Sequence, residues 1–191
     1  MDAAKAKKVI ESFKGLPILV IGDVMLDSYI WGHVDRISPE APVPVIRVKR
    51  RDFRLGGAAN VALNLQSLGA APTICALIGK DEAGRKLKEL LENRGLPTEG
   101  IVESEARPTT IKTRVIASHQ HVVRVDDESD AETNGAEVEA LWRVIQPLVG
   151  SSKAVIFEDY DKGAMNGALI ERTVSLANEL QIPTIVAPKT R

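Results

Sequence analysis

RLGGAANVA, residues 54–62, joins an extended polar segment to a helix through two consecutive glycines. Glycine has no Cβ, so a turn built from Gly56 and Gly57 lets backbone N–H groups approach a ligand closely. The first N–H groups of the following helix favour electron-rich ligand oxygens, and Asn60 can donate and accept hydrogen bonds toward a hydroxyl. A glycine pair alone would predict only a tight turn. Followed directly by a helix, it predicts a binding site.

A continuous apolar run, ILVI at residues 18–21, lies upstream and is typical of a strand buried on both faces. It brings Asp23 to its carboxyl end, and Asp27 follows within GDVMLD. Open α/β sheets bind ligands outside the carboxyl ends of their strands. A carboxylate there accepts hydrogen bonds from sugar hydroxyls, each contributing roughly 1.5–3 kcal/mol. Two carboxylates and a glycine turn predict a polyol site. The alternative is that Asp23 caps a turn and Asp27 is an ordinary surface residue.

The rest of the chain alternates predicted strands and helices. Apolar runs and helical periodicity separate the two kinds of segment, and Gly69 and Gly95 end two of the helices. The predicted strands are residues 18–21, 73–78, 154–157 and 184–186. The predicted helices are a short N-terminal helix that closes over residues 9–13, followed by residues 60–68, 82–93, 136–146 and 168–180. We therefore expect an α/β fold with a parallel sheet covered by helices.

Two β-rich segments interrupt this alternation, at about residues 28–54 and 109–126. The first contains β-forming residues among prolines, which is typical of edge strands outside the main sheet. The second has two runs of β-branched residues on either side of the polar sequence SHQH at residues 118–121, so it predicts a hairpin. We expect the two segments to pack together.

Basic residues gather on the second β-rich segment, at Lys112, Arg114 and Arg124, and Lys162 follows a later strand. A substrate that already carries a phosphate would need positive charge here, preferably from arginine, which binds phosphate through two parallel hydrogen bonds. The alternative is a solvated strand face for the first three residues. For Lys162 the alternative is a salt bridge within a loop.

Length and composition limit the function classes. With 191 residues, of which 44% are hydrophobic, the chain can bury one sizeable core, and its composition is not that of a membrane-spanning protein. Its formal charge of −1 gives no general attraction to nucleic acid. Cys75 is the sole cysteine, and His119 and His121 have no partner at a metal-binding spacing, so we predict no disulfide and no metal site. Residues 1–14 lack the apolar core of a signal peptide, so we expect a cytoplasmic protein.

The combination of GDVMLD, a basic β-rich segment and GGAAN resembles the ribokinase/PfkB family of carbohydrate kinases. Further stretches resemble its D-glycero-D-manno-heptose 7-phosphate kinase branch: RISPEAPVPV at 36–45, KTRVIA at 112–117, RVD at 124–126 and DYDKG at 159–163. The similarity runs from about Leu16 to the last residue. It implies that residues 1–191 belong to one ribokinase-like domain, in which the two β-rich segments form a lid sheet over the sugar site. In many members the lid also makes a homodimer contact.

The resemblance implies a reaction as well. In this branch the anomeric hydroxyl of heptose 7-phosphate attacks the γ-phosphate of Mg-ATP. The heptose 1,7-bisphosphate formed serves ADP-heptose and lipopolysaccharide precursor synthesis, often with an adenylyltransferase domain fused to the kinase. The family pattern assigns sugar contacts to Asp23, Asp27, Gly56, Gly57 and Asn60, and it favours Arg114 and Arg124 as substrate contacts. Lys112 and Lys162 are candidate phosphate contacts by their positions in the chain. The sequence departs from the pattern at Ser118, His119 and His121, where the family is richer in Asn and Gln.

The resembling kinases also have a second glycine-rich turn, of the Gly-Ala-Gly-Asp type. Its helix start holds the transferring phosphate, and its aspartate takes the proton of the attacking hydroxyl. This chain has no glycine after Gly167, and Ala187 stands where an aspartate is expected before Pro188 and Lys189. We therefore expect a truncated kinase that lacks its catalytic base, which lies beyond Arg191, and most of its nucleotide-binding part.

Other interpretations stay open. The chain is alternatively a non-catalytic module that binds a sugar phosphate or dimerises through its lid sheet, and the missing second turn favours this. A dinucleotide-binding domain is disfavoured, because its glycine fingerprint should follow the first strand, where the chain has Gly22 and Asp23. An unfinished parallel sheet would expose an apolar edge, so we expect self-association.

Overall fold

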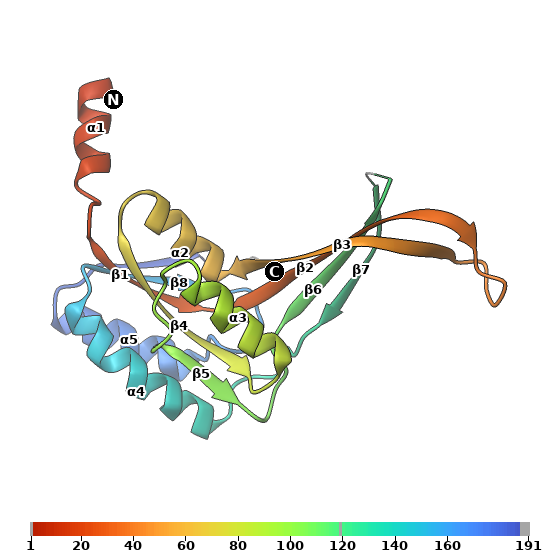
Figure 1. Cartoon of the computed structure of the whole chain (residues 1–191). Coiled ribbons are helices and arrows are strands. Elements are labelled where there is room, and N and C mark those ends of the chain that lie inside the picture. Colours follow the sequence, from red (N-terminus) through yellow and green to blue (C-terminus); the bar gives the residue numbers. More distant parts are fainter. Residues whose placement is uncertain (1, 119, 188–191) are drawn as a thin grey trace.

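The computed structural model describes residues 2–118 and 120–187 and confirms the predicted α/β fold (Figure 1). The larger of two sheets has the strand order β5-β4-β1-β8-β9, and all its pairings are parallel. Its strands are β1 (Pro17–Gly22), β4 (Ala71–Gly79), β5 (Ile101–Ser104), β8 (Ala154–Glu158) and β9 (Thr184–Ala187).

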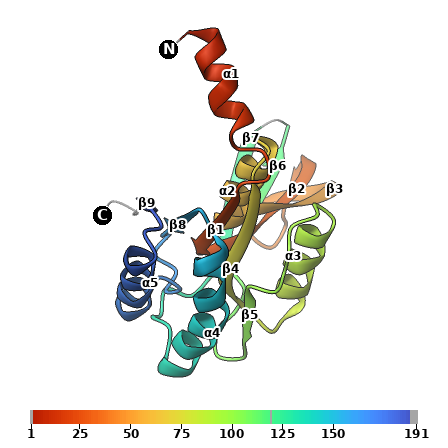
Figure 2. The ribbon, with the colours of Figure 1, turned by 90° about the vertical axis from the view of Figure 1, so that its left-hand side faces the viewer.

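β1 lies at the centre of this sheet and is buried on both faces. Ile18 and Val20 pack with α2 (Ala58–Ser67) and α3 (Glu82–Glu92), whereas Leu19 and Ile21 pack with α4 (Gly135–Ser151) and α5 (Gly167–Glu179). Figure 2 shows the two helix pairs on opposite sides of the sheet. The continuous apolar run of β1 therefore reflects two hydrophobic cores, one on each face.

A second, four-stranded sheet extends away from the helices (Figure 1) and is called the small sheet below. β2 (Val24–Ile37) and β3 (Pro44–Gly57) form an antiparallel hairpin, as do β6 (Ile111–Ala117) and β7 (Gln120–Asp127). The hairpins join through a parallel β2–β6 pairing, so the two β-rich segments pack together as predicted. Asp23 alone separates β1 from β2, and the chain passes from one sheet to the other at that residue.

Three elements differ from the sequence prediction. β5 was not predicted, because four residues with one charge give little periodic signal. α4 continues to Ser151 instead of ending before Pro147, because Ile145 and Val149 are fully buried on either side of the proline and hold the helix in place. α1 (Ala3–Glu11) ends before Phe13, where the sequence predicts its close, and lies apart from both sheets (Figure 1). No described helix is long and apolar enough to cross a membrane.

Candidate functional site

Asp23 holds a loop at the carboxyl end of the central strand. Its side chain is buried and accepts hydrogen bonds from the backbone N–H groups of Tyr160 (2.8 Å), Lys162 (3.2 Å) and Ala164 (3.2 Å). Burial raises the pKa of Asp23, and these three hydrogen bonds oppose that rise. Asp23 therefore fixes the 159–164 loop, which follows β8. A sugar contact at Asp23 stays a prediction.

Gly57 brings the start of α2 against the end of β1. Its φ is +59°, and a Cβ at this position would lie 2.3 Å from the carbonyl oxygen of Asp23. That oxygen accepts a hydrogen bond from the N–H of Ala58 at 2.9 Å. Among the described helices, side chains cap the starts of α1, α3, α4 and α5, but none caps α2. The other N–H groups of the first turn of α2 thus have no side-chain cap and can meet a ligand.

Asp27, Gly56 and Arg114 come together from three neighbouring strands. Arg114 Nη1 donates to Asp27 Oδ1 at 2.5 Å, and a Cβ on Gly56 would lie 2.7 Å from Asp27 Oδ2. Asp27 also contributes to the raised pKa of Tyr160, after burial and the charge of Glu158. The Asp27 carboxylate thus lies against the glycine turn, and its charge acts on Tyr160 of the 159–164 loop.

Tyr29 presents its ring on the same face of the small sheet as Asp27. The two residues are two positions apart in β2, and successive side chains of a strand point to opposite faces. The guanidinium carbon of Arg54 lies 4.7 Å from the ring centroid, and that of Arg114 lies 5.4 Å from it. Residues directly paired with these on the neighbouring strands point to the same face, so all four strands contribute to it. The Asp27 face, as we call it, consists of Asp27, Tyr29, Trp31, Arg50, Asp52, Arg54, Lys112, Arg114, Arg124 and Asp126.

A second ring and arginine lie farther out on the Asp27 face. Trp31 stacks near Tyr29, with centroids 6.1 Å apart, and Arg50 lies 5.2 Å from the Trp31 ring. Asp52 accepts hydrogen bonds from Trp31 Nε1 at 3.0 Å and pairs with Arg50 at 2.8 Å. The sequence prediction missed Tyr29, Trp31 and these β3 residues. The available signal was their spacing of two residues along each strand, which places them on one face of the sheet.

A chain of ion pairs joins the small sheet to the 159–164 loop. Glu128 accepts from Lys112 at 2.7 Å and from Lys162 at 2.7 Å, and Asp126 accepts from Lys112 at 3.0 Å and from Arg124 at 2.9 Å. Burial by itself would raise the pKa of Glu128, but its bonds to Lys112 and Lys162 outweigh burial and lower it. We call Lys112, Glu128 and Lys162 the latch. Every cation predicted to contact phosphate thus has a carboxylate partner in the structure.

Arg107 also binds the 159–164 loop, and the sequence analysis did not predict this residue. Its guanidinium donates to the carbonyl oxygens of Lys162 (3.1 Å) and Ala131, and its Nε lies 3.7 Å from Glu137 Oε1. The Arg107 side chain is only 8% exposed. No sequence pattern marks an arginine whose partners are backbone oxygens of distant loops.

The remaining predicted residues have no described contact with Asp27. Asn60 is exposed in the first turn of α2 and lines a hollow of about 170 Å³ together with Arg54 and Arg94. His121 lies in β7, Ala187 ends β9, and His119 and residues 188–191 fall outside the described residues.

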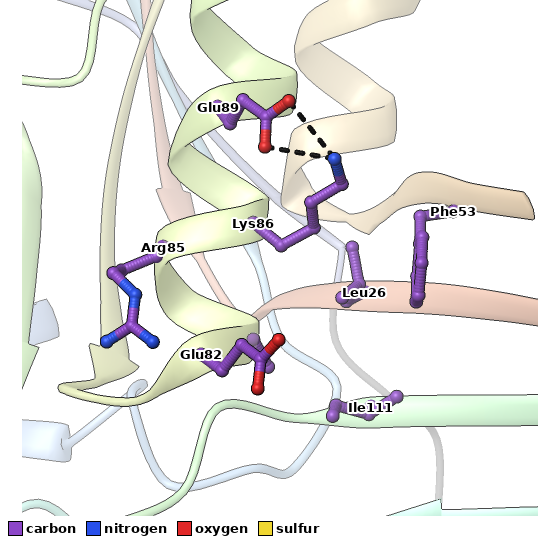
Figure 3. A pocket seen from close by; sticks show the side chains of 8 residues that line it. Leu26, Phe53, Glu82, Arg85, Lys86, Glu89 and Ile111 are labelled. Atoms are coloured by element: carbon purple, nitrogen blue, oxygen red, sulfur yellow. Dashed lines mark hydrogen bonds and ion pairs between the residues drawn. The ribbon is translucent and has the colours of Figure 1, made fainter.

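A larger hollow, of about 620 Å³, lies on the other face of the small sheet, against α3 (Figure 3). Leu26, Phe53 and Ile111 form an apolar side, opposite charged residues of α3 that include the Lys86–Glu89 ion pair. Leu26 precedes Asp27 in β2 and points to the opposite face. This hollow is therefore separated from the Asp27 carboxylate by the sheet itself.

The arrangement can hold a hydroxyl-rich ligand that carries an anionic group. Asp27 supplies acceptors, the start of α2 supplies backbone donors, and Lys112, Arg114 and Arg124 supply ammonium and guanidinium groups. In residues 2–118 and 120–187 no group of three or more His, Cys, Asp and Glu side chains is placed to hold a metal ion.

Known proteins with similar sequences cover almost the whole chain. The bifunctional protein HldE of Citrifermentans bemidjiense is 39% identical over 189 residues, which is 99% of this chain and 39% of that protein. The bifunctional protein HldE of Wolinella succinogenes is 45% identical over 174 residues, which is 91% of this chain and 37% of that protein. The chain thus spans well under half the length of these curated relatives.

Solved structures share the fold at lower identity. Phosphofructokinase-2 from Escherichia coli, in complex with fructose-6-phosphate, matches 93% of this chain and 56% of its own chain, with a TM-score of 0.66 and 19% identity. A family model described as pfkB family carbohydrate kinase matches residues 17–191.

Proposed function

The chain belongs to the pfkB family of carbohydrate kinases, and we propose that it binds heptose 7-phosphate for phosphorylation at the anomeric hydroxyl. The observation that carries this proposal is the meeting of Asp27 with Gly56 and Arg114 beside the uncapped start of α2. The HldE relatives, at 39% and 45% identity, support the choice of a heptose phosphate as the sugar.

We assign the sugar hydroxyls to Asp27 and to the first turn of α2. An ionised carboxylate is acceptor-only, so adjacent hydroxyls of a sugar can donate to both of its oxygens. The first N–H groups of α2 and the Asn60 side chain supply the opposite partners, because sugar hydroxyls also accept hydrogen bonds. Asp23, Gly56 and Gly57 place these groups, since they bring β1, β3 and α2 into contact.

We assign the substrate phosphate to the basic side of the Asp27 face, with Arg114 and Arg124 as predicted contacts and Lys112 and Lys162 as further ones. Ion pairs already hold these four cations in place, which favours a preorganised site. A phosphate that enters would share these cations with Asp126 and Glu128.

Sugar kinases of this family use ATP, with Mg²⁺ typical, and when bound Mg-ATP supplies the phosphoryl group that the sugar hydroxyl attacks. We assign the described residues no step in phosphoryl transfer. Their part is to bind and orient the sugar phosphate. In this proposal the product serves ADP-heptose and lipopolysaccharide precursor synthesis in the cytoplasm.

Thermal unfolding with separate ligands tests the proposal. A ligand that binds the native state at 100 times its Kd stabilises it by about 2.7 kcal/mol, which raises the Tm of a protein this size by several degrees. We expect such a rise with heptose 7-phosphate and a smaller one with unphosphorylated heptose. An unchanged Tm with both sugars would contradict the proposal. Mg-ATP, added alone and with the sugar phosphate, measures nucleotide binding independently.

A second role, dimerisation through the small sheet, is favoured by the face opposite Asp27. That face exposes three large apolar side chains: Phe53 (40% exposed), Val123 (48%) and Val125 (56%). Apolar side chains gathered on an exposed face are typical of a protein–protein contact. We propose a homodimer that covers them. Sedimentation should show a dimer that Val125→Asp dissociates, whereas Val9→Asp, on the separate helix α1, should leave it intact. A monomeric wild-type chain would contradict this role.

A further inference from the structure

Arg54 differs from the other cations of the Asp27 face in its pairing. Each of the others pairs with a carboxylate. These ion pairs are Arg50 with Asp52, Lys112 with Asp126 and Glu128, Arg114 with Asp27, and Arg124 with Asp126. Within the described part of the chain, the Arg54 guanidinium contacts the Tyr29 ring and has no ion pair or hydrogen bond.

The two carboxylates nearest to Arg54 along the sheet are engaged elsewhere. Asp52, two residues before it on the same face, turns to Arg50 and to Trp31 Nε1. Asp27, directly opposite Arg54 in the β2–β3 register, gives one carboxylate oxygen to Arg114 and lies against Gly56 with the other. Arg54 thus carries a positive charge that the sheet itself does not neutralise.

The stacking of Arg54 on Tyr29 orients that charge. A guanidinium that lies over an aromatic ring keeps its N–H groups directed outward in its own plane, where they can bind phosphate through two hydrogen bonds. Arg114 lies near the same ring, 5.4 Å from its centroid, so the two guanidinium groups flank one anchor. Arg54 is also only two residues before Gly56, so an anion bound to it would lie next to the sugar site.

From this pairing and geometry we propose that Arg54, stacked on Tyr29, binds the phosphate group of the sugar-phosphate substrate and selects phosphorylated over unphosphorylated sugar. The proposal rests on the function proposed above and names a contact beyond those predicted from the sequence. Binding at a paired cation must weaken an existing ion pair, whereas binding at Arg54 adds a charged interaction without that loss.

The test compares two arginine substitutions on one face of one strand. Arg54→Met keeps an unbranched side chain that can pack on Tyr29 but removes the charge, and Arg50→Met makes the same change at an arginine that also lies near an aromatic ring but is paired with Asp52. Calorimetry gives the Kd of the wild type and both variants for heptose 7-phosphate and for unphosphorylated heptose. Far-UV circular dichroism checks that each variant is folded.

We expect Arg54→Met to weaken heptose 7-phosphate binding about tenfold or more, a loss of about 1.4 kcal/mol, with little change for unphosphorylated heptose. Arg50→Met should leave both Kd values near wild type. Inorganic phosphate should compete with heptose 7-phosphate in the wild type and compete less in Arg54→Met. If Arg54→Met does not fold, Arg54→Lys, which keeps the charge but loses the planar fork, should still reduce the preference for the phosphorylated sugar.

The two proposals fail in different ways. If the wild type binds heptose 7-phosphate and Arg54→Met keeps the full preference for the phosphorylated sugar, the role of Arg54 is wrong and the proposed function stands. If the wild type binds neither sugar, the proposed function and the role of Arg54 fall together. Equal losses in Arg54→Met and Arg50→Met would show a general charge effect and would also overturn the assignment to Arg54.

Discussion

Arg114 donates to Asp27 at 2.5 Å across 87 residues of sequence, and this contact joins the two hairpins of the small sheet. The arginine approaches one carboxylate oxygen of Asp27, while the other oxygen lies against Gly56. Asp27 is therefore held in one orientation beside the glycine turn before any ligand binds. Such preorganisation lowers the cost of binding a sugar.

Asp27→Asn should weaken binding of phosphorylated and unphosphorylated heptose alike, by roughly tenfold to a hundredfold, because charged hydrogen bonds worth about 1.5–3 kcal/mol are lost. Calorimetry with the two sugars measures this. Asp35→Asn is the control, since Asp35 lies on the same strand but pairs with His33 and Arg47, far out on the hairpin. Unchanged binding in Asp27→Asn would remove Asp27 from the site.

Gly57→Ala should destabilise the fold more than Gly95→Ala. Both glycines have positive φ, at +59° and +67°, so both substitutions carry backbone strain of about 1–2 kcal/mol. Only at Gly57 would the new Cβ also overlap the carbonyl oxygen of Asp23, whereas no atom lies within 4 Å at Gly95. We expect an additional loss of about 1–3 kcal/mol at Gly57, measured by denaturant unfolding. Equal losses of stability in the two variants would mean that the start of α2 moves to accommodate the new Cβ.

Glu128→Gln should lower the free energy of unfolding by about 1–2 kcal/mol at neutral pH, because it breaks the latch. The folded-state pKa of Glu128 lies below its usual 4.5, so this stabilisation is present above pH 4.5 and is lost as the pH falls through the lowered value. The pKa of Lys112 is raised above 10.5, because its bonds to Glu128 and Asp126 outweigh burial, so its share persists until the pH rises above that value.

The measurement for the latch is urea unfolding of the wild type and Glu128→Gln over a range of pH. The difference between their free energies of unfolding should stay constant near neutral pH and shrink in acid. Glu132→Gln, at an exposed carboxylate of the following segment, should match the wild type throughout. A difference that persists in acid would point to lost packing instead of a lost ion pair.

Cys75 should be unreactive in the native protein. It is fully buried in β4, and burial, together with the charge of Glu99, raises the pKa of its thiol to about 12. The thiolate is the reactive species, so a thiol reagent at mildly alkaline pH should label the chain only after denaturation. Ser175→Cys, at an exposed position of α5, should be labelled while folded. Rapid labelling of native wild type would show that β4 opens readily.

The fold was predictable where the sequence carries a local signal. The ILVI run of β1 predicted a strand with both faces covered, because only such a strand lacks polar alternation, and Gly56 and Gly57 predicted the turn into α2. β5 and the continuation of α4 past Pro147 were missed, because tertiary packing, and not local preference, maintains them.

The sequence named candidate residues for the site but not the contacts among them. Asp27, Arg114 and Lys112 were named as candidates, yet nothing local shows that Arg114 reaches Asp27 or that Lys112 and Lys162 share Glu128. These pairs depend on the parallel β2–β6 pairing between distant segments. Arg54 was overlooked because its significance lies in having no carboxylate partner, and pairing is a property of the folded sheet.

β1 is the middle strand of the large sheet, and its two neighbours are formed by residues 71–79 and 154–158. During synthesis the N-terminal half can pair β1 with β4, but the other edge of β1 stays open until residues 154–158 have left the ribosome. A nascent chain in that interval presents an apolar strand edge to other chains. We therefore expect the yield of soluble protein to depend on chaperone supply during translation more than on the stability of the finished fold.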